Sequence, residues 1–137
     1  MARLPHQLTR TRHPKLWTGP CSSSRRVESW DPAAGGGWRA EPRLNDARGG
    51  TSATQAGGKV CVAGGEEPVG TIASVECLVG DRWERVARLA LPRHGLAVGG
   101  LNGRVHLIGG GPQPGLFVSP AHEVFSVGHG INTRDTP

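Results

Sequence analysis

The stretch Trp83-Glu-Arg-Val-Ala-Arg-Leu89 repeats an earlier stretch, Trp38-Arg-Ala-Glu-Pro-Arg-Leu44, at a distance of 45 residues. A fixed period of about this length is typical of propellers and solenoids, in which one small unit of secondary structure is copied along the chain. The same offset superposes further landmarks without a gap: Arg48 on Arg93, and Gly64-Gly65 on Gly109-Gly110. A glutamate next to an apolar residue recurs at a similar spacing, at Glu28, Glu76 and Glu123.

Each unit is predicted to consist of β-strands. The apolar runs Val60–Ala63 and Val105–Ile108 lie between glycines and suit strands that are buried on both faces. Gly57-Gly58 and Asn102-Gly103 precede them, and such pairs favour two-residue hairpin turns. Further strands are expected at Gly50–Gln55, Ile72–Leu78, the segment of Trp83, Gly95–Gly100 and Ala121–Val127. Four antiparallel strands per unit is the composition of one propeller blade.

The landmarks resemble the kelch repeat, in which a Gly-Gly doublet ends an apolar strand, a Val-Glu-x-aromatic strand follows and a Trp comes next. Here these are Gly64-Gly65, Val75-Glu76 and Trp83, then a second doublet at Gly109-Gly110. The usual Tyr is replaced, because the chain has none. The resemblance implies an all-β, partial kelch-type propeller in which Trp38 and Trp83 pack between neighbouring blades.

The predicted repeats span 27–127 and amount to about two blades. They divide into a partial blade at 27–41, a full blade at 48–86 and a three-stranded blade at 93–127, followed by a disordered tail at 128–137. Propellers close with about 4–8 blades. We therefore expect the chain either to complete a ring with other copies or to be a fragment of a longer propeller.

The composition and charge agree with a turn-rich chain. The 137 residues include 22 glycines and 11 prolines, which disfavour long helices, and no apolar run approaches the ~20 residues that span a membrane. The positive net charge of +5 comes from residues 1–26, which hold 6 of the 16 basic residues and no acidic ones, while the rest of the chain is close to neutral. This segment is expected to be a disordered basic arm or a degraded upstream segment, and its composition is also that of a transit peptide. A charged tail is weak grounds for nucleic-acid binding.

The cysteines are three in number, Cys21, Cys61 and Cys77, without a Cys-x-x-Cys pair. An odd number at these spacings predicts neither a disulfide framework nor a zinc site. Cys61 and Cys77 are expected to be small core residues. Unpaired cysteines, together with the lack of a secretory or transmembrane segment, favour the cytoplasm.

The sequence shows little that would carry catalysis. The histidines have no metal-ligand spacing, and the loop after Gly109-Gly110 lacks the helix that a phosphate-binding loop needs. We expect no catalytic residue, no metal and no cofactor. The expected function is a protein-interaction module. The alternative is the remnant of a propeller enzyme acting on sugars, although galactose-oxidase-like chemistry would need a tyrosine radical.

The resemblance also implies where a partner would bind. In kelch propellers the loops at the blade mouths form the recognition surface, and the arginine that opens each inner strand can face the central pocket. The expected binding residues are Arg48, Arg93, Glu66, Glu67, Pro112 and Gln113. The alternative for the two arginines is a structural hydrogen bond to a neighbouring blade.

Overall fold

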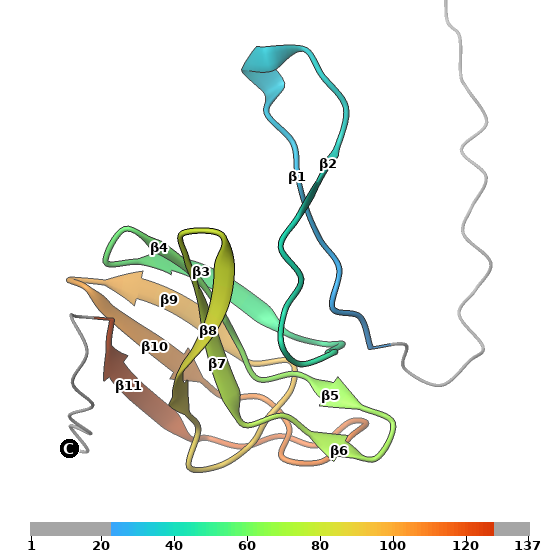
Figure 1. Ribbon diagram of the computed structural model, residues 1–137. Coiled ribbons are helices and arrows are strands. Elements are labelled where there is room, and N and C mark those ends of the chain that lie inside the picture. The colour runs from blue at the N-terminus through green and yellow to red at the C-terminus, as the bar shows by residue number, and fades with distance from the viewer. Residues whose placement is uncertain (1–22, 128–137) are drawn as a thin grey trace, which may run out of the picture.

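The computed structural model describes residues 23–127, and these form small antiparallel β-sheets that lie one after another (Figure 1). The predicted all-β fold class is confirmed. The predicted tail, most of the predicted arm and Cys21 lie outside the described residues. The strands are β1 (Val27–Ser29), β2 (Arg39–Glu41), β3 (Ser52–Ala56), β4 (Lys59–Ala63), β5 (Glu66–Glu67), β6 (Gly70–Thr71), β7 (Ser74–Val79), β8 (Arg82–Arg88), β9 (Ala97–Leu101), β10 (Arg104–Ile108) and β11 (His122–Ser126).

Two sheets make up most of the fold. The four-stranded sheet has the order β3-β4-β7-β8, and the three-stranded sheet has the order β11-β10-β9. Both begin with a hairpin whose two turn residues have positive φ, at Gly57-Gly58 and at Asn102-Gly103. This is the backbone conformation that a two-residue type I′ turn requires. β1 and β2 form a separate hairpin that encloses the short 3₁₀ turn Pro32–Ala34, and β5 pairs with β6.

The hydrophobic core lies between the two large sheets. β3 runs beside β9, where the Gly95 amide donates to the Gly50 carbonyl at 2.7 Å and the Ser52 hydroxyl donates to the Leu96 carbonyl at 2.6 Å. Behind these strands, Val75 of the four-stranded sheet packs in one cluster with Val105 and Leu107 of the three-stranded sheet, all with no exposed surface. Each sheet thus buries a face that it could not bury alone.

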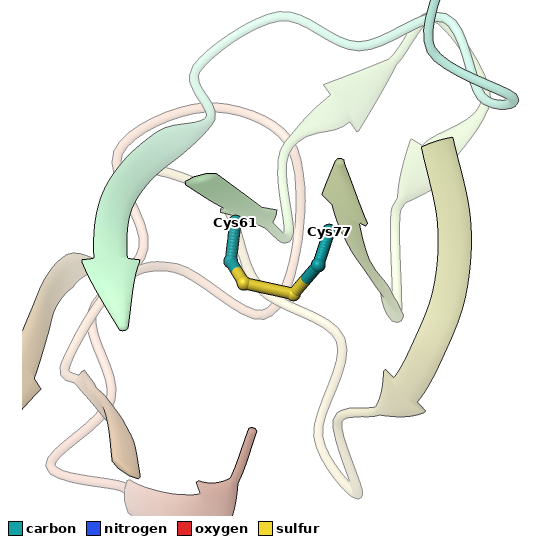
Figure 2. The surroundings of a disulfide bond; sticks show 2 residues. All are labelled: Cys61 and Cys77. Carbon is teal, nitrogen blue, oxygen red and sulfur yellow. A yellow bond between two sulfur atoms is a disulfide. The ribbon is translucent and has the colours of Figure 1, made fainter. Parts of the chain in front are cut away.

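A disulfide bond joins Cys61 to Cys77 inside this core (Figure 2). The two residues are direct partners in the register of β4 and β7, and their Cα atoms lie 4.0 Å apart. The prediction that they are unpaired is wrong, although their burial is as predicted. The odd cysteine count therefore no longer favours a reducing compartment.

The second glycine of each doublet permits a close approach of two backbones. A Cβ atom on Gly65 would lie 2.8 Å from the carbonyl oxygen of Gly49, and one on Gly110 would lie 2.6 Å from that of His94. Both glycines have positive φ, as does Gly109, which precedes Gly110. The doublets therefore recur because any side chain would collide at the same place in both sheets.

The two repeated tryptophans lie in different surroundings. Trp83 is 6% exposed, packs with Leu44 and Val62, and its indole N–H donates to the Pro42 carbonyl at 2.9 Å. Trp38 is 70% exposed and has Trp30 as its aromatic neighbour, with ring centroids 6.2 Å apart. The prediction of a buried Trp38 is wrong. The β1–β2 hairpin leaves both Trp30 and Trp38 exposed, whereas the four-stranded sheet buries Trp83.

Two smaller predictions also need correction. Within the arm predicted to be disordered, Ser24 pairs with Arg48 and the Arg25 side chain donates to the Leu44 carbonyl at 2.6 Å, so residues 23–26 belong to the fold. Strand β10 is buried on one face instead of two, because Ile108 is half exposed. Within residues 23–127, no helix is long and apolar enough to cross a membrane.

The face of the three-stranded sheet that points away from the core is largely uncovered. Because side chains alternate along a strand, this face carries every second residue of each strand. We call it the open face; it consists of Ala97, Gly99, Leu101, Arg104, His106, Ile108, His122, Val124 and Ser126, which are exposed or half-buried.

Candidate functional site

Arg48, a predicted binding residue, lies in the interior of the four-stranded sheet. Its side chain has no exposed surface and forms an ion pair with Glu76, which is equally buried. It also donates to the carbonyl of Gly64 at 2.8 Å and to the hydroxyl of Ser74 at 2.7 Å. The Glu76 carboxylate accepts from the backbone amide of Asn45 at 2.7 Å. The two charges and their remaining hydrogen-bonding groups are thus satisfied within the chain.

Arg93 repeats this arrangement in the three-stranded sheet. Its side chain has no exposed surface and lies 2.8 Å from the Glu123 carboxylate, which accepts from the amide of Ala90 at 2.7 Å. The prediction that Arg48 and Arg93 bind acidic groups of a partner is therefore wrong. The alternative, a structural role, fits both arginines, but each one bonds within its own sheet instead of to a neighbouring one.

The other predicted residues gather at one end of the sheets, where the β5–β6 hairpin meets the loop 111–120. The carbonyl of Pro112 accepts from the Thr71 hydroxyl at 3.1 Å, and the carbonyl of Gln113 lies 2.9 Å from Nε2 of His94. A carbonyl oxygen can only accept, so this nitrogen carries a proton. Nδ1 of the same ring lies 3.8 Å from the carboxylate of the buried Glu66. His94, which the sequence did not single out, therefore braces both loops.

The tips of these two loops carry apolar side chains that nothing in the described chain covers. Val69 on the hairpin and Val118 on the longer loop are each about 90% exposed, Leu116 is fully exposed and Phe117 is half exposed. We call these four residues the loop tips. Soluble proteins rarely hold several large apolar side chains in water at one place without a binding role.

A second polar site lies on the other side of the hairpin, around Asp46. An open cavity of about 420 Å³ is lined by Asp46, Glu67, Arg85 and Arg88, among others. Arg85 holds Asp46 with two hydrogen bonds of 2.6 and 3.1 Å. This bidentate contact is the main reason that the pKa of Asp46 falls from 3.8 to about 2. Glu67 thus faces a different surface from the buried Glu66.

The described residues offer no cluster of metal ligands larger than a pair. Within 23–127, no three His, Cys, Asp or Glu side chains are placed to hold one metal ion. The largest group of convergent ligand nitrogens in that range is the pair His106 and His122 on the open face.

Comparison with known proteins supports the fold and not a family. No family model matches the sequence, and no curated protein matches it. The fold is similar to 66 chains of solved structures, among them that of YjhT. The similarity to YjhT has a TM-score of 0.61 at 14% sequence identity and covers 73% of this chain. The match covers 34% of the length of YjhT, so the chain described here spans about a third of that protein.

Proposed function

We propose that the chain is a self-associating part of a kelch-type β-propeller, and that it acts as a protein-interaction module without catalytic activity of its own. The sequence repeat supports the propeller, because the two large sheets carry the same landmarks in the same places. Two ion pairs are equivalent: Arg48 with Glu76, and Arg93 with Glu123. In each pair the arginine precedes the first strand of its sheet, and the glutamate lies in a later strand. The alternative of a sugar-active enzyme stays a prediction of the resemblance alone.

The observation that carries the binding role is the set of loop tips. Their four apolar side chains are exposed, yet the loops that present them are braced by Thr71, by His94 and by hydrogen bonds to the sheet ends. A braced loop loses little conformational freedom when a partner binds, so more of the contact energy appears as affinity. The partner is a protein that offers an exposed apolar segment.

Site-specific photo-crosslinking tests this surface. The full chain carries p-benzoylphenylalanine in place of Leu116. The control carries it in place of Val60, an exposed residue on β4 of the four-stranded sheet. We expect a discrete protein adduct from position 116 that excess unmodified chain competes away and that Phe117→Asp abolishes. Adducts that form equally from position 60, or that survive Phe117→Asp, contradict the proposal.

The self-association is supported by what covers each sheet. The face of the four-stranded sheet equivalent to the open face holds Cys61, Val75 and Cys77, and these three residues are buried in the core shared with the three-stranded sheet. On the open face Leu101 is 62% exposed, and at the opposite end of the chain Trp38 is 70% exposed. The two uncovered surfaces are thus the two halves of one repeat interface. A second copy fits here, joined head to tail.

A mixing experiment tests this contact. Wild-type chain is expected to elute as an oligomer in size-exclusion chromatography with light scattering, and both Trp38→Ser and Leu101→Lys are expected to elute as monomers. Each variant keeps one intact end, so an equimolar mixture of the two should form a dimer and nothing larger. A wild-type chain that stays monomeric at tens of micromolar, where modest interfaces associate, refutes the contact.

A further inference from the structure

We propose that His106 and His122 form a chelating site for a borderline transition-metal ion such as Ni²⁺, Cu²⁺ or Zn²⁺. This proposal does not depend on the proposed function, and it concerns the chain whose open face no second copy covers, because the proposed self-association would bury both histidines. The two side chains come from neighbouring strands, β10 and β11, and both belong to the open face.

The register of the strands brings the two rings together. His106 is opposite Val124 and Ile108 is opposite His122, so the two histidines are diagonal neighbours on one face. Diagonal neighbours in an antiparallel pair are within reach of long side chains. The rings stack with centroids 5.4 Å apart, and Nδ1 of His106 lies 3.2 Å from Nε2 of His122.

This separation suits two nitrogens on one metal. Zn–N bonds of about 2.0–2.1 Å at a tetrahedral or right angle place two nitrogens roughly 2.9–3.4 Å apart. The observed distance between the two ring nitrogens, 3.2 Å, falls within that span. Without metal, one ring donates its proton to the other. With metal, a modest tilt of each ring turns both lone pairs toward a common point.

The surroundings select the type of metal. The open face carries no carboxylate, since Glu123 points to the other side and bonds to Arg93 and Ala90. Arg104 lies on the same face, and its positive charge opposes all cations alike, so the choice of metal rests on the ligand atoms. Mg²⁺ and Ca²⁺ need oxygen ligands, so they have no ligands here, whereas imidazole suits Ni²⁺, Cu²⁺ and Zn²⁺. Two ligands leave the other coordination positions open to water.

The site is also specific to one of the two repeats. The positions equivalent to His106 and His122 in the four-stranded sheet are Cys61 and Val75, which are buried in the core. The histidine pair is therefore not part of what the repeat needs in order to fold, and its substitution should leave the sheets intact.

The test uses the full chain with Trp38→Ser, whose open face a second copy does not cover, and follows binding of Ni²⁺ by calorimetry and binding of diamagnetic Zn²⁺ by NMR of the imidazole nitrogens. We expect the nitrogen signals of both rings to shift together at the same Zn²⁺ concentration. His106→Gln and His122→Gln should each weaken Ni²⁺ binding by about tenfold or more, because one ligand is lost from a chelate. The control His13→Gln, outside the described residues, should leave this site unchanged.

Two results overturn the proposal. In one, the signals of the two rings shift at different Zn²⁺ concentrations, which means that they bind separately. In the other, both histidine variants bind Ni²⁺ as tightly as the Trp38→Ser chain, which means that the metal is held elsewhere. The NMR spectra of the backbone show in the same samples whether each variant is folded.

Discussion

Replacing Arg48 with methionine tests whether the buried ion pair stabilises the four-stranded sheet. The substitution leaves the Glu76 carboxylate with no exposed surface and without its ion-pair partner, and it removes the donors to Gly64 and Ser74. Removing one partner of a buried pair costs about 3–5 kcal/mol. We expect Arg48→Met to lower the free energy of unfolding by this amount, measured by urea titration with tryptophan fluorescence.

The matched comparison is Arg93→Met. The Glu123 carboxylate keeps 24% of its surface in water, so solvent can stabilise it after Arg93 is lost. The expected cost is then the lost charged hydrogen bond, about 2 kcal/mol. If Arg48→Met costs less than Arg93→Met, or less than about 1 kcal/mol, an exposed surface pair would explain the data better and the reasoning is refuted. Arg48→Lys, which keeps the charge without the planar fork, should fall between wild type and Arg48→Met, and it serves if the methionine variant does not fold.

Three further predictions follow from the same structure. Reducing the disulfide, whose cysteines are 16 residues apart, should lower the free energy of unfolding by about 3 kcal/mol in urea titrations with and without dithiothreitol. Trp83→Ala should cost about 3–5 kcal/mol in urea titrations followed by circular dichroism, whereas Trp38→Ala in the exposed hairpin should cost less than about 0.5 kcal/mol in the monomeric Leu101→Lys chain. The pKa of Asp46 is lowered to about 2, so its contribution to stability is present above pH 3.8 and is lost as the pH falls toward 2. Arg85→Gln should raise that pKa toward 3.8 in carboxyl-carbon NMR, and an unchanged value would exclude the Arg85 contact as its cause.

The sequence predicted the strands better than it predicted their partners. The turns at Gly57-Gly58 and Asn102-Gly103 and the strands that follow them could be placed from local patterns, because turn chemistry and apolar runs act over a few residues. The disulfide could not be placed in this way. Cys61 and Cys77 meet because β4 pairs with β7 in one register, and that register is set by the whole sheet, whereas counting cysteines gave an odd number.

The role of the recurring charges could not be predicted either. The repeat located Arg48 and Glu76 as separate landmarks, with no indication that they are partners 28 residues apart in sequence. An arginine at the start of a strand can face a pocket or the interior of its own sheet, and both give the same sequence pattern. Only the fold shows that the carboxylate lies within reach, which turns a predicted binding residue into a structural one.

The residues that recur between the two large sheets and the residues that differ have separate roles. The recurring ones, such as Arg48 with Arg93, are buried and bonded within their sheets. One differing residue is Leu116, which lies in a loop much longer than its counterpart, the turn between β5 and β6. Another is His106, whose counterpart in the four-stranded sheet is the buried Cys61. A repeat that must stack restricts the first group to structural roles, because each copy needs the same contacts. A binding site for a molecule other than a further copy of the chain is then expected in the second group, and this is why the loop tips and the histidine pair are better candidates than any landmark of the repeat.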